Sequence, residues 1–344
     1  MTLLAVQDLQ VHFRTTGGVV RAVDGVSFEL AEGESLGLVG ESGCGKTTVA
    51  KAILRLLAPN GSVPEGRIIF RGRDLLRLPP KEFQQDRWRH IALVPQSAMN
   101  ALDPVYRVGT QIVEAIRAHE ACSRREAWQR AERLFEAVGL EPDRLRQYPH
   151  QFSGGMRQRA IIAMALALGP ELVIADEPTT ALDVVIQDQV FEEFERLQQG
   201  GRKALLLITH DISLVAENCG RVAVMYAGQI VEMAPAREIF AGPLHPYTIG
   251  LQNAFPNLRS ASRELISIAG APPNLAAPSE GCRFAPRCPF AQARCAQEAP
   301  RLAPAGAGHL VACHFVDQAV DFRRRGGLAE TWNRDEVERT ARAG

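Results

Sequence analysis

Two runs of alternating apolar and polar residues occupy the start of the chain, Leu4 to Phe13 and Val20 to Leu30. Residues 15–18 between them read Thr-Thr-Gly-Gly, and glycine pairs favour tight turns. A period of two residues is typical of a half-buried strand, so we predict an antiparallel hairpin at the N-terminus.

From Ser35 onward, short apolar runs alternate with helical patterns. An apolar strand is predicted at Ser35–Val39, followed by a glycine-rich turn and a helix at Lys46–Leu57 that Pro59, Asn60 and Gly61 terminate. Further strands are predicted at Arg67–Phe70, Ile91–Pro95, Leu172–Ala175, Ala204–Thr209 and Arg221–Met225. Strands alternating with helices are typical of parallel βαβ units, so the predicted fold class is α/β.

Two stretches depart from this alternation. Residues 102–170 contain no convincing strand pattern, and apolar residues between 128 and 138 recur at helical spacing, which predicts a helical subdomain whose own core they form. After Pro243 the chain becomes rich in proline and short elements. We therefore predict a core domain at residues 1–242 and a small irregular C-terminal domain at residues 243–344.

Composition narrows the possible partners. Of 344 residues, 46% are hydrophobic, and 39 Lys and Arg balance 39 Asp and Glu for a net charge of zero. Zero net charge argues against binding nucleic acid by bulk electrostatics, and we expect no nucleic-acid partner. The longest uncharged apolar stretch, Ala160–Gly169, is far shorter than the roughly 18 residues of a membrane span, and the N-terminus lacks a signal-peptide pattern.

Residues 40–47, Gly-Glu-Ser-Gly-Cys-Gly-Lys-Thr, match the phosphate-loop pattern and lie between a predicted strand and a predicted helix. Glycines let successive N–H groups point at phosphate oxygens, while Lys46 reaches the β and γ phosphates and Thr47 offers a hydroxyl to Mg²⁺. The candidate ATP-binding residues here are Gly40, Ser42, Gly43, Cys44, Gly45, Lys46, Thr47 and Thr48.

Two adjacent acids end the apolar strand that begins at Leu172. Ligands bind at the carboxyl ends of strands in such sheets. Asp176 is placed to hold Mg²⁺ through water, and Glu177 is placed to polarise a water in line with the γ phosphate.

The run Phe152-Ser153-Gly154-Gly155-Met156, about twenty residues before these acids, resembles the signature sequence of ATP-binding cassette (ABC) proteins. Phe152 and Met156 depart from the commonest pattern, which has Leu and Gln there. Further motifs match in order over about residues 1–240: Gln96 resembles the family's Q-loop, Ala181-Leu182-Asp183 its D-loop, His210 its switch histidine, and Phe13 its adenine-stacking aromatic.

This resemblance implies a phosphate-loop NTPase core of ABC type, with an antiparallel β subdomain and a helical subdomain. It also implies a head-to-tail pair of cassettes, in which ATP lies between the phosphate loop of one and the signature of the other. The residues implied to contact ATP in trans are Ser153, Gly154, Gly155, Met156 and Asp183, and Gln96 is implied to join Thr47 and Asp176 at Mg²⁺. With Lys46, Glu177 and His210 all present, the chain is expected to hydrolyse ATP.

Two neighbouring stretches resemble the subfamily that powers import of di- and oligopeptides. Residues 99–104, Met-Asn-Ala-Leu-Asp-Pro, follow the Q-loop, and residues 245–248, His-Pro-Tyr-Thr, look like the subfamily's C-terminal hallmark. The implied partners are a second cassette subunit, two transmembrane permeases and an extracytoplasmic peptide-binding protein, with this chain peripheral on the cytoplasmic face of the plasma membrane. Nickel, glutathione or a peptide antibiotic as substrate, a soluble non-transport ABC protein and a regulatory binding module are the alternatives.

Four of the seven cysteines, Cys282, Cys288, Cys295 and Cys313, cluster in the C-terminal region with spacings of five, six and seventeen residues. A reducing compartment disfavours disulfides, and structural zinc usually shows closer Cys pairs, so an iron–sulfur cluster, zinc and free thiols all stay open, with His309 and His314 as substitute zinc ligands. The peptide-importer resemblance extends to these cysteines and implies a 4Fe–4S cluster. The scattered Cys44, Cys122 and Cys219 are interpreted as non-ligands.

Overall fold

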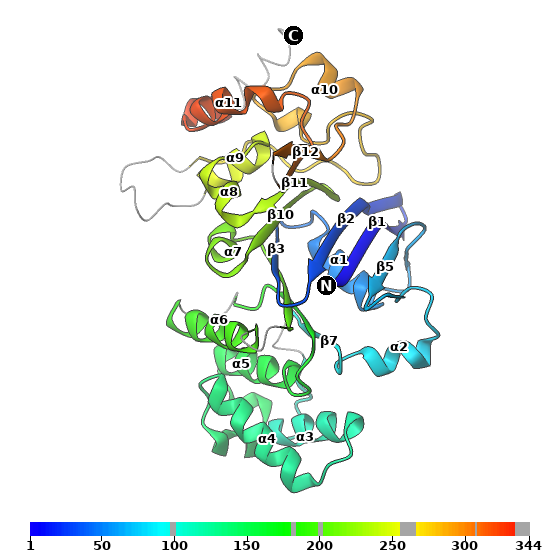
Figure 1. The fold of residues 1–344 in the computed structure, drawn as a ribbon, viewed down its shortest axis with the longest axis vertical. Helices are drawn as coiled ribbons and strands as arrows, with labels where there is room; N and C mark the ends of the chain where they lie inside the picture. The colour runs from blue at the N-terminus through cyan, green and yellow to red at the C-terminus, as the bar shows by residue number, and fades with distance from the viewer. Residues whose placement is uncertain (97–100, 180–183, 199–201, 255–265, 307, 334–344) are drawn as a thin grey trace. The chain divides into compact units, whose positions relative to one another are not determined.

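The computed structural model of this chain describes residues 1–96, 101–179, 184–198, 202–254, 266–306 and 308–333 (Figure 1). It divides into two compact units. We call the first, Met1–Leu4 with Leu30–Ser35 and Phe70–Ile208, the helical unit. The second, Ala5–Glu29 with Leu36–Ile69 and Thr209–Gly344, is the phosphate-loop unit.

An antiparallel β layer opens the phosphate-loop unit. Most of β1 (Thr2–Thr15) and β2 (Gly18–Ala31) belongs to it, and the strand order is β2-β1-β5, with β5 at Arg67–Phe70 and β4 (Gly61–Ser62) also pairing with β1. Burial alternates as predicted around Leu9 and Val11 in β1 and over Val26–Leu30 in β2, whereas Leu3–Val6 are all buried. The predicted hairpin is confirmed, and both strands are longer than the alternation indicated.

A mixed sheet carries the phosphate loop. Strand β3 (Ser35–Val39) pairs in parallel with β10 (Arg221–Tyr226), and β11 (Gln229–Pro235) runs antiparallel to β10. Helix α1 is Lys46–Ile53, so the prediction of a helix to Leu57 was wrong. The helix stops early because Arg55 adopts a left-handed backbone conformation with φ of 53°.

The C-terminal region continues this same sheet. Strand β13 (His309–Val311) adds antiparallel to β11, and β12 (Ala303–Gly306) adds to β13. Helix α11 (Ala319–Gly326) packs against α9 (Pro246–Asn253) (Figure 1). The other elements after residue 209 are α7 (Ile212–Asn218), α8 (Ala236–Ala241), η4 (Ala285–Arg287), α10 (Ala293–Gln297), η5 (Val316–Gln318) and η6 (Ala329–Trp332).

The helical unit has its own parallel strands. β7 (Ile91–Val94) and β9 (Ala204–Thr209) flank β8 (Leu172–Asp176), in which every residue is buried. Residues 102–170, all described, contain helices and no strand, as the pattern predicted. The remaining elements are β6 (Arg73–Asp74), α2 (Pro80–Asp86), α3 (Val108–His119), α4 (Arg124–Ala137), η2 (Pro142–Arg146), η3 (Pro149–Gln151), α5 (Gly154–Ala165) and α6 (Val184–Gln198).

The helices of the described residues are too short or too polar to cross a bilayer: none meets the length and hydropathy that a membrane span requires.

Candidate functional site

The phosphate loop occupies a tight backbone turn between β3 and α1. Gly40, Gly43 and Gly45 have φ values of 155°, 82° and 107°, which side-chain-bearing residues rarely adopt. A Cβ atom on Gly40 would lie 2.1 Å from the Met225 carbonyl oxygen, and one on Gly45 would lie 2.3 Å from the Ala22 carbonyl oxygen. The loop therefore requires glycine at 40 and 45 for both conformation and space, and at 43 for conformation alone.

Lys46 lies inside this loop. Its side chain is 5% exposed, and Nζ donates hydrogen bonds to the carbonyl oxygens of Gly40 at 2.6 Å and Glu41 at 3.0 Å. Cys44 Sγ lies 3.7 Å from the same ammonium, and burial raises the pKa of the thiol. The loop is folded around its lysine, with Thr47 and Thr48 half-buried on the first turn of α1.

The two predicted acids end β8 in the helical unit. Asp176 is 4% exposed, whereas Glu177 is half-buried and adopts a left-handed conformation with φ of 48°. The Glu177 N–H donates to the Ile208 carbonyl oxygen at 2.7 Å, and Gln96 Nε2 donates to Glu177 Oε2 at 2.8 Å. The structure thus brings Gln96 and Glu177 together. Strained non-glycine residues of this kind cluster at functional sites.

The predicted signature lies at the start of α5. Exposed Ser153 caps the helix by accepting a hydrogen bond from the Met156 N–H at 3.3 Å, and Gly154 and Gly155 form its first turn. Phe152 is 4% exposed and its ring packs edge-on against Phe135 at 6.4 Å. Phe152, which stands where Leu is common, therefore packs in the core of the helical unit.

Other predicted site residues lie at separate places. His210 is exposed after β9, and the next residue, Asp211, caps α7 by accepting from the Ser213 N–H at 2.8 Å. Phe13 is half-buried on β1 opposite Gly61. Asp183, Met99 and Asn100 lie outside the described residues, as does the rest of the D-loop.

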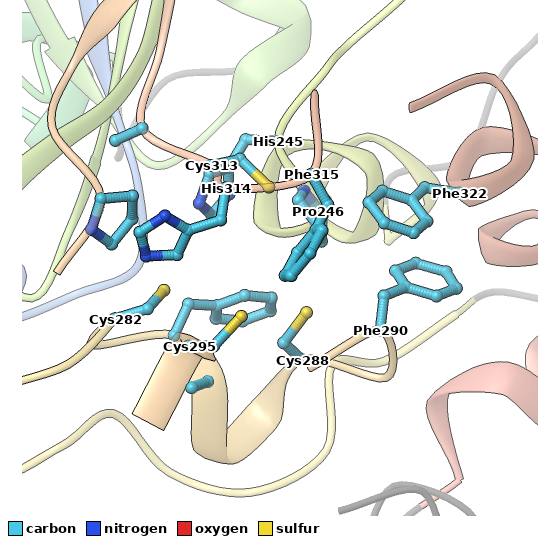
Figure 2. Close-up of a pocket in the computed structure, with 14 residues that line it drawn as sticks. His245, Pro246, Cys282, Cys288, Phe290, Cys295, Cys313, His314, Phe315 and Phe322 are labelled. Carbon is cyan, nitrogen blue, oxygen red and sulfur yellow. The ribbon is translucent and has the colours of Figure 1, made fainter. Parts of the chain in front are cut away.

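The four clustered cysteines line one pocket of the phosphate-loop unit. Cys282, Cys288, Cys295 and Cys313 line a partly open pocket and turn their sulfur atoms toward it (Figure 2). Burial, reinforced by neighbouring thiols, raises the pKa of Cys282 and Cys288 and that of Cys313 to about 11. Residues 31 positions apart along the chain thus converge.

Of the two histidines predicted as substitute zinc ligands, His314 is among the residues that line this pocket and His309 is not. His309 Nε2 lies 2.7 Å from Glu232 Oε1, and His314 Nε2 lies 2.9 Å from the Glu298 carbonyl oxygen, although His314 also lines the pocket. His245, which the sequence did not single out for this role, lines it as well. Across the described part of the chain, no group of three or more His, Cys, Asp or Glu side chains is placed to hold a metal ion.

Sequence reasoning missed a second set of contacts at the phosphate loop. The Glu41 carboxylate is paired with Arg287 at 2.8 Å, and the Glu41 N–H donates to the Tyr247 hydroxyl oxygen at 2.9 Å. The available signal was an acidic residue inside a loop that binds anions. Gln158 was also missed: its buried side chain donates from Nε2 to the Pro178 carbonyl oxygen at 2.6 Å, just beyond Glu177.

Comparison with known families finds two matches along the chain. A family described as "ABC transporter" matches residues 23–180, and one described as "Oligopeptide/dipeptide transporter, C-terminal region" matches residues 231–295. The first contains the phosphate loop, signature and paired acids. The second contains residues 245–248 and three of the four clustered cysteines.

Similar proteins cover nearly the whole chain. A probable peptide ABC transporter ATP-binding protein of Sinorhizobium fredii is 47% identical over 93% of this chain and 97% of its own. The dipeptide transport ATP-binding protein DppD of Bacillus subtilis is 46% identical over 95% and 99%. Among solved structures, the dimeric ATP-binding cassette MJ0796 bound to ADP and Pi has a TM-score of 0.63 at 25% identity, over 68% of this chain and 99% of that one.

Proposed function

This chain belongs to the ATP-binding cassette family, among the ATP-binding subunits of oligopeptide and dipeptide transporters, and we propose that it hydrolyses ATP to energise import of di- and oligopeptides through a permease pair. The observation that carries the proposal is the 46% identity to a dipeptide transport subunit over 95% of the chain, including its C-terminal region.

Each site residue has a role in this reaction. The loop amides of Gly40 to Thr48 bind the phosphates, Lys46 moves its ammonium from the loop carbonyls to the β and γ oxygens, and Phe13 stacks on adenine. Thr47, Asp176 and Gln96 would supply the oxygen donors that Mg²⁺ prefers, and a bound ion would neutralise phosphate charge.

Glu177 accepts a proton from the water that lies in line with the γ phosphate. Gln96 Nε2 positions this carboxylate by donating a hydrogen bond to Oε2 at 2.8 Å. His210 contacts the γ phosphate from the end of β9. Ser153, Gly154, Gly155, Met156 and Asp183 contact the ATP of a partner cassette, for which the N-terminus of α5 offers amides and a partial positive charge.

The test is Glu177→Gln in the transporter reconstituted into vesicles with its permeases and peptide-binding protein. Removal of the base should lower turnover about 100-fold or more while ATP binding is retained. Unchanged ATP turnover would remove Glu177 from this role.

The partners we propose are a second cassette, a paralogue of this one, two transmembrane permeases and an extracytoplasmic peptide-binding protein, with this chain peripheral on the cytoplasmic face. Peptide should stimulate ATP hydrolysis in the same vesicles. If nickel, glutathione or a peptide antibiotic stimulated ATP hydrolysis and short peptides did not, the proposed substrate would be wrong and the ATPase assignment would stand.

We further propose that Cys282, Cys288, Cys295 and Cys313 hold a 4Fe–4S cluster. Four thiols lining one pocket are a suitable donor set, and thiolate ligands suit both iron–sulfur clusters and zinc. The cluster would stabilise the fold of a segment whose helices and strands are short.

Iron and sulfide analysis of anaerobically purified protein tests this assignment. We expect a brown protein with about four iron atoms per chain, and Cys288→Ser should lose the colour. Cys219→Ser serves as the control, because that buried thiol lies outside the pocket residues. A colourless protein with stoichiometric zinc would contradict the cluster.

A further inference from the structure

An acidic residue of the phosphate loop is held by the far end of the chain. Glu41 follows Gly40 directly, and its carboxylate accepts a bidentate pair of hydrogen bonds from Arg287, 246 positions later: Nη1 to Oε2 at 2.8 Å and Nη2 to Oε1 at 3.0 Å. Two parallel bonds of this kind fix orientation as well as distance. The contact lies within the phosphate-loop unit.

Arg287 uses all of its hydrogen-bonding capacity at this place. Besides Glu41, it donates from Nε to the Ala269 carbonyl oxygen, from Nη2 to the Ile268 carbonyl oxygen and from Nη1 to the Tyr226 hydroxyl. That makes five bonds for the five N–H donors of a guanidinium. The side chain is only 6% exposed, so the group is fixed in one orientation.

The backbone of Glu41 is held independently by Tyr247. Its hydroxyl oxygen accepts the Glu41 N–H at 2.9 Å, and the residue is completely buried. Tyr247 lies in the first turn of α9, which His245 caps by accepting the Tyr247 N–H at 3.0 Å. The centroid of the Tyr247 ring lies 4.7 Å from that of Tyr226, and the Tyr226 hydroxyl accepts a hydrogen bond from Arg287.

Glu41 links the contacts of Arg287 and Tyr247 to the phosphate-binding lysine, Lys46. Lys46 Nζ donates to the Glu41 carbonyl oxygen, whose N–H and carboxylate are the groups that Tyr247 and Arg287 hold. An acidic side chain in an anion-binding loop also repels phosphate unless a cation neutralises it. Arg287 supplies that cation.

We propose that Arg287 is a positioning residue for nucleotide binding: from the C-terminal region it holds and neutralises Glu41, with Tyr247 fixing the backbone of the same residue. The inference rests on the proposed ATPase function and adds to it a role for residues outside the nucleotide-binding motifs. In this proposal, residues 245–248 place the Tyr247 hydroxyl where it accepts the Glu41 N–H of the phosphate loop.

Equilibrium binding of MgADP to the full chain tests the proposal, because this measurement requires no partner cassette. We expect Arg287→Met to raise the dissociation constant about tenfold, the loss of a charge-assisted pair, and Arg287→Lys to recover part of it. Tyr247→Phe keeps the ring and removes the hydroxyl, and should weaken binding about fivefold. Arg294→Met is the matched control, since Arg294 is a C-terminal arginine whose pair with Glu298 is exposed.

A double-mutant cycle separates positioning from general support of the fold. If Arg287 acts through Glu41, Arg287→Met should change affinity less than threefold in a Glu41→Ala background. An equal factor in both backgrounds would assign Arg287 a merely structural role and overturn the proposal.

Two further outcomes distinguish the claims. If Arg287→Met does not fold, wild-type affinity in both Tyr247→Phe and Arg287→Lys would overturn the inference. If the unaltered chain binds no MgADP, the proposed function itself fails. If the chain binds MgADP and every one of these variants has the same dissociation constant as the unaltered chain, only the positioning role is removed.

Discussion

Single residues fix the phosphate loop through backbone conformation and contact. Gly45 precedes α1 with φ of 107°, and the space a Cβ would need is filled by the Ala22 carbonyl oxygen. Glu177 shows the complementary case, since a non-glycine residue is held at φ of 48° by hydrogen bonds at its N–H and its carboxylate. At both positions the neighbours determine the backbone.

Gly45→Ala should therefore destabilise the chain more than an alanine at another left-handed glycine. The matched control is Gly18→Ala, with φ of 117° and nothing within 4 Å of the added Cβ. We expect the control to lose about 1 kcal/mol through backbone strain and Gly45→Ala to lose about 1–3 kcal/mol more through overpacking. Thermal unfolding measures both, and equal shifts in Tm would contradict the steric argument.

At the scale of elements, helix α5 connects the signature to the end of β8. Ser153 caps this helix, and Gln158, one turn further along, donates to the Pro178 carbonyl oxygen at 2.6 Å. Because Pro178 follows Glu177, this bond fixes the segment that carries the proposed base. Two elements separated in sequence thus share one buried polar contact.

Gln158→Met should lower ATP turnover about tenfold, because a buried carbonyl loses its partner and the Glu177 segment is no longer fixed. Affinity for ADP measured without Mg²⁺ should stay unchanged, because Phe13 and Gly40 to Thr48, the residues proposed to bind the nucleotide itself, are unaltered. Gln129→Met on the exposed side of α4 is the control, and steady-state ATPase assays give the comparison. Equal turnover in the two variants would contradict a role for the bond.

Much at this scale was predictable. Alternation predicted β1 and β2, and apolar runs predicted the parallel strands, because these periods follow from local geometry. Strands β11, β12 and β13 were missed. β12 and β13 are short, and β12 contains Pro304 and Gly306. β13 pairs with β11, about 80 positions earlier in the chain, and β12 pairs with β13.

For the whole molecule, the C-terminal region is continuous with the phosphate-loop unit. Strand β13 extends its sheet, and Arg283 donates to the Ala227 carbonyl oxygen and pairs with Asp24 of β2. The described residues from 209 to 333 belong to the same compact unit as the phosphate loop. The predicted boundary after residue 242 describes a change in composition, and whether it is also a boundary of folding stays a prediction to test.

A chain that ends at Gly242 should not remain a soluble nucleotide-binding protein, because it exposes the edge of β11 and the buried Tyr226. A chain that ends at Asn333 keeps the described contacts of the C-terminal region and serves as the control. Soluble yield and MgADP binding are the measurements. A soluble 1–242 chain with full affinity would establish that domain as autonomous.

The sequence by itself determined the chemistry and the family. The phosphate loop, the signature and the paired acids are short motifs that resemble those of ABC ATPases, and residues 99–104 and 245–248 resemble those of the peptide importers. The comparisons confirm the family and its peptide-transporter type. The sequence also placed four cysteines in one region without fixing what they bind.

Only the tertiary structure decided which distant residues meet. Arg287 and Tyr247 reach Glu41 across more than 200 residues, and the four thiols converge on one pocket although their spacing follows no regular period. The physical reason is that local motifs depend on backbone geometry over a few residues, whereas these contacts depend on how the sheet is completed by β11 and β13.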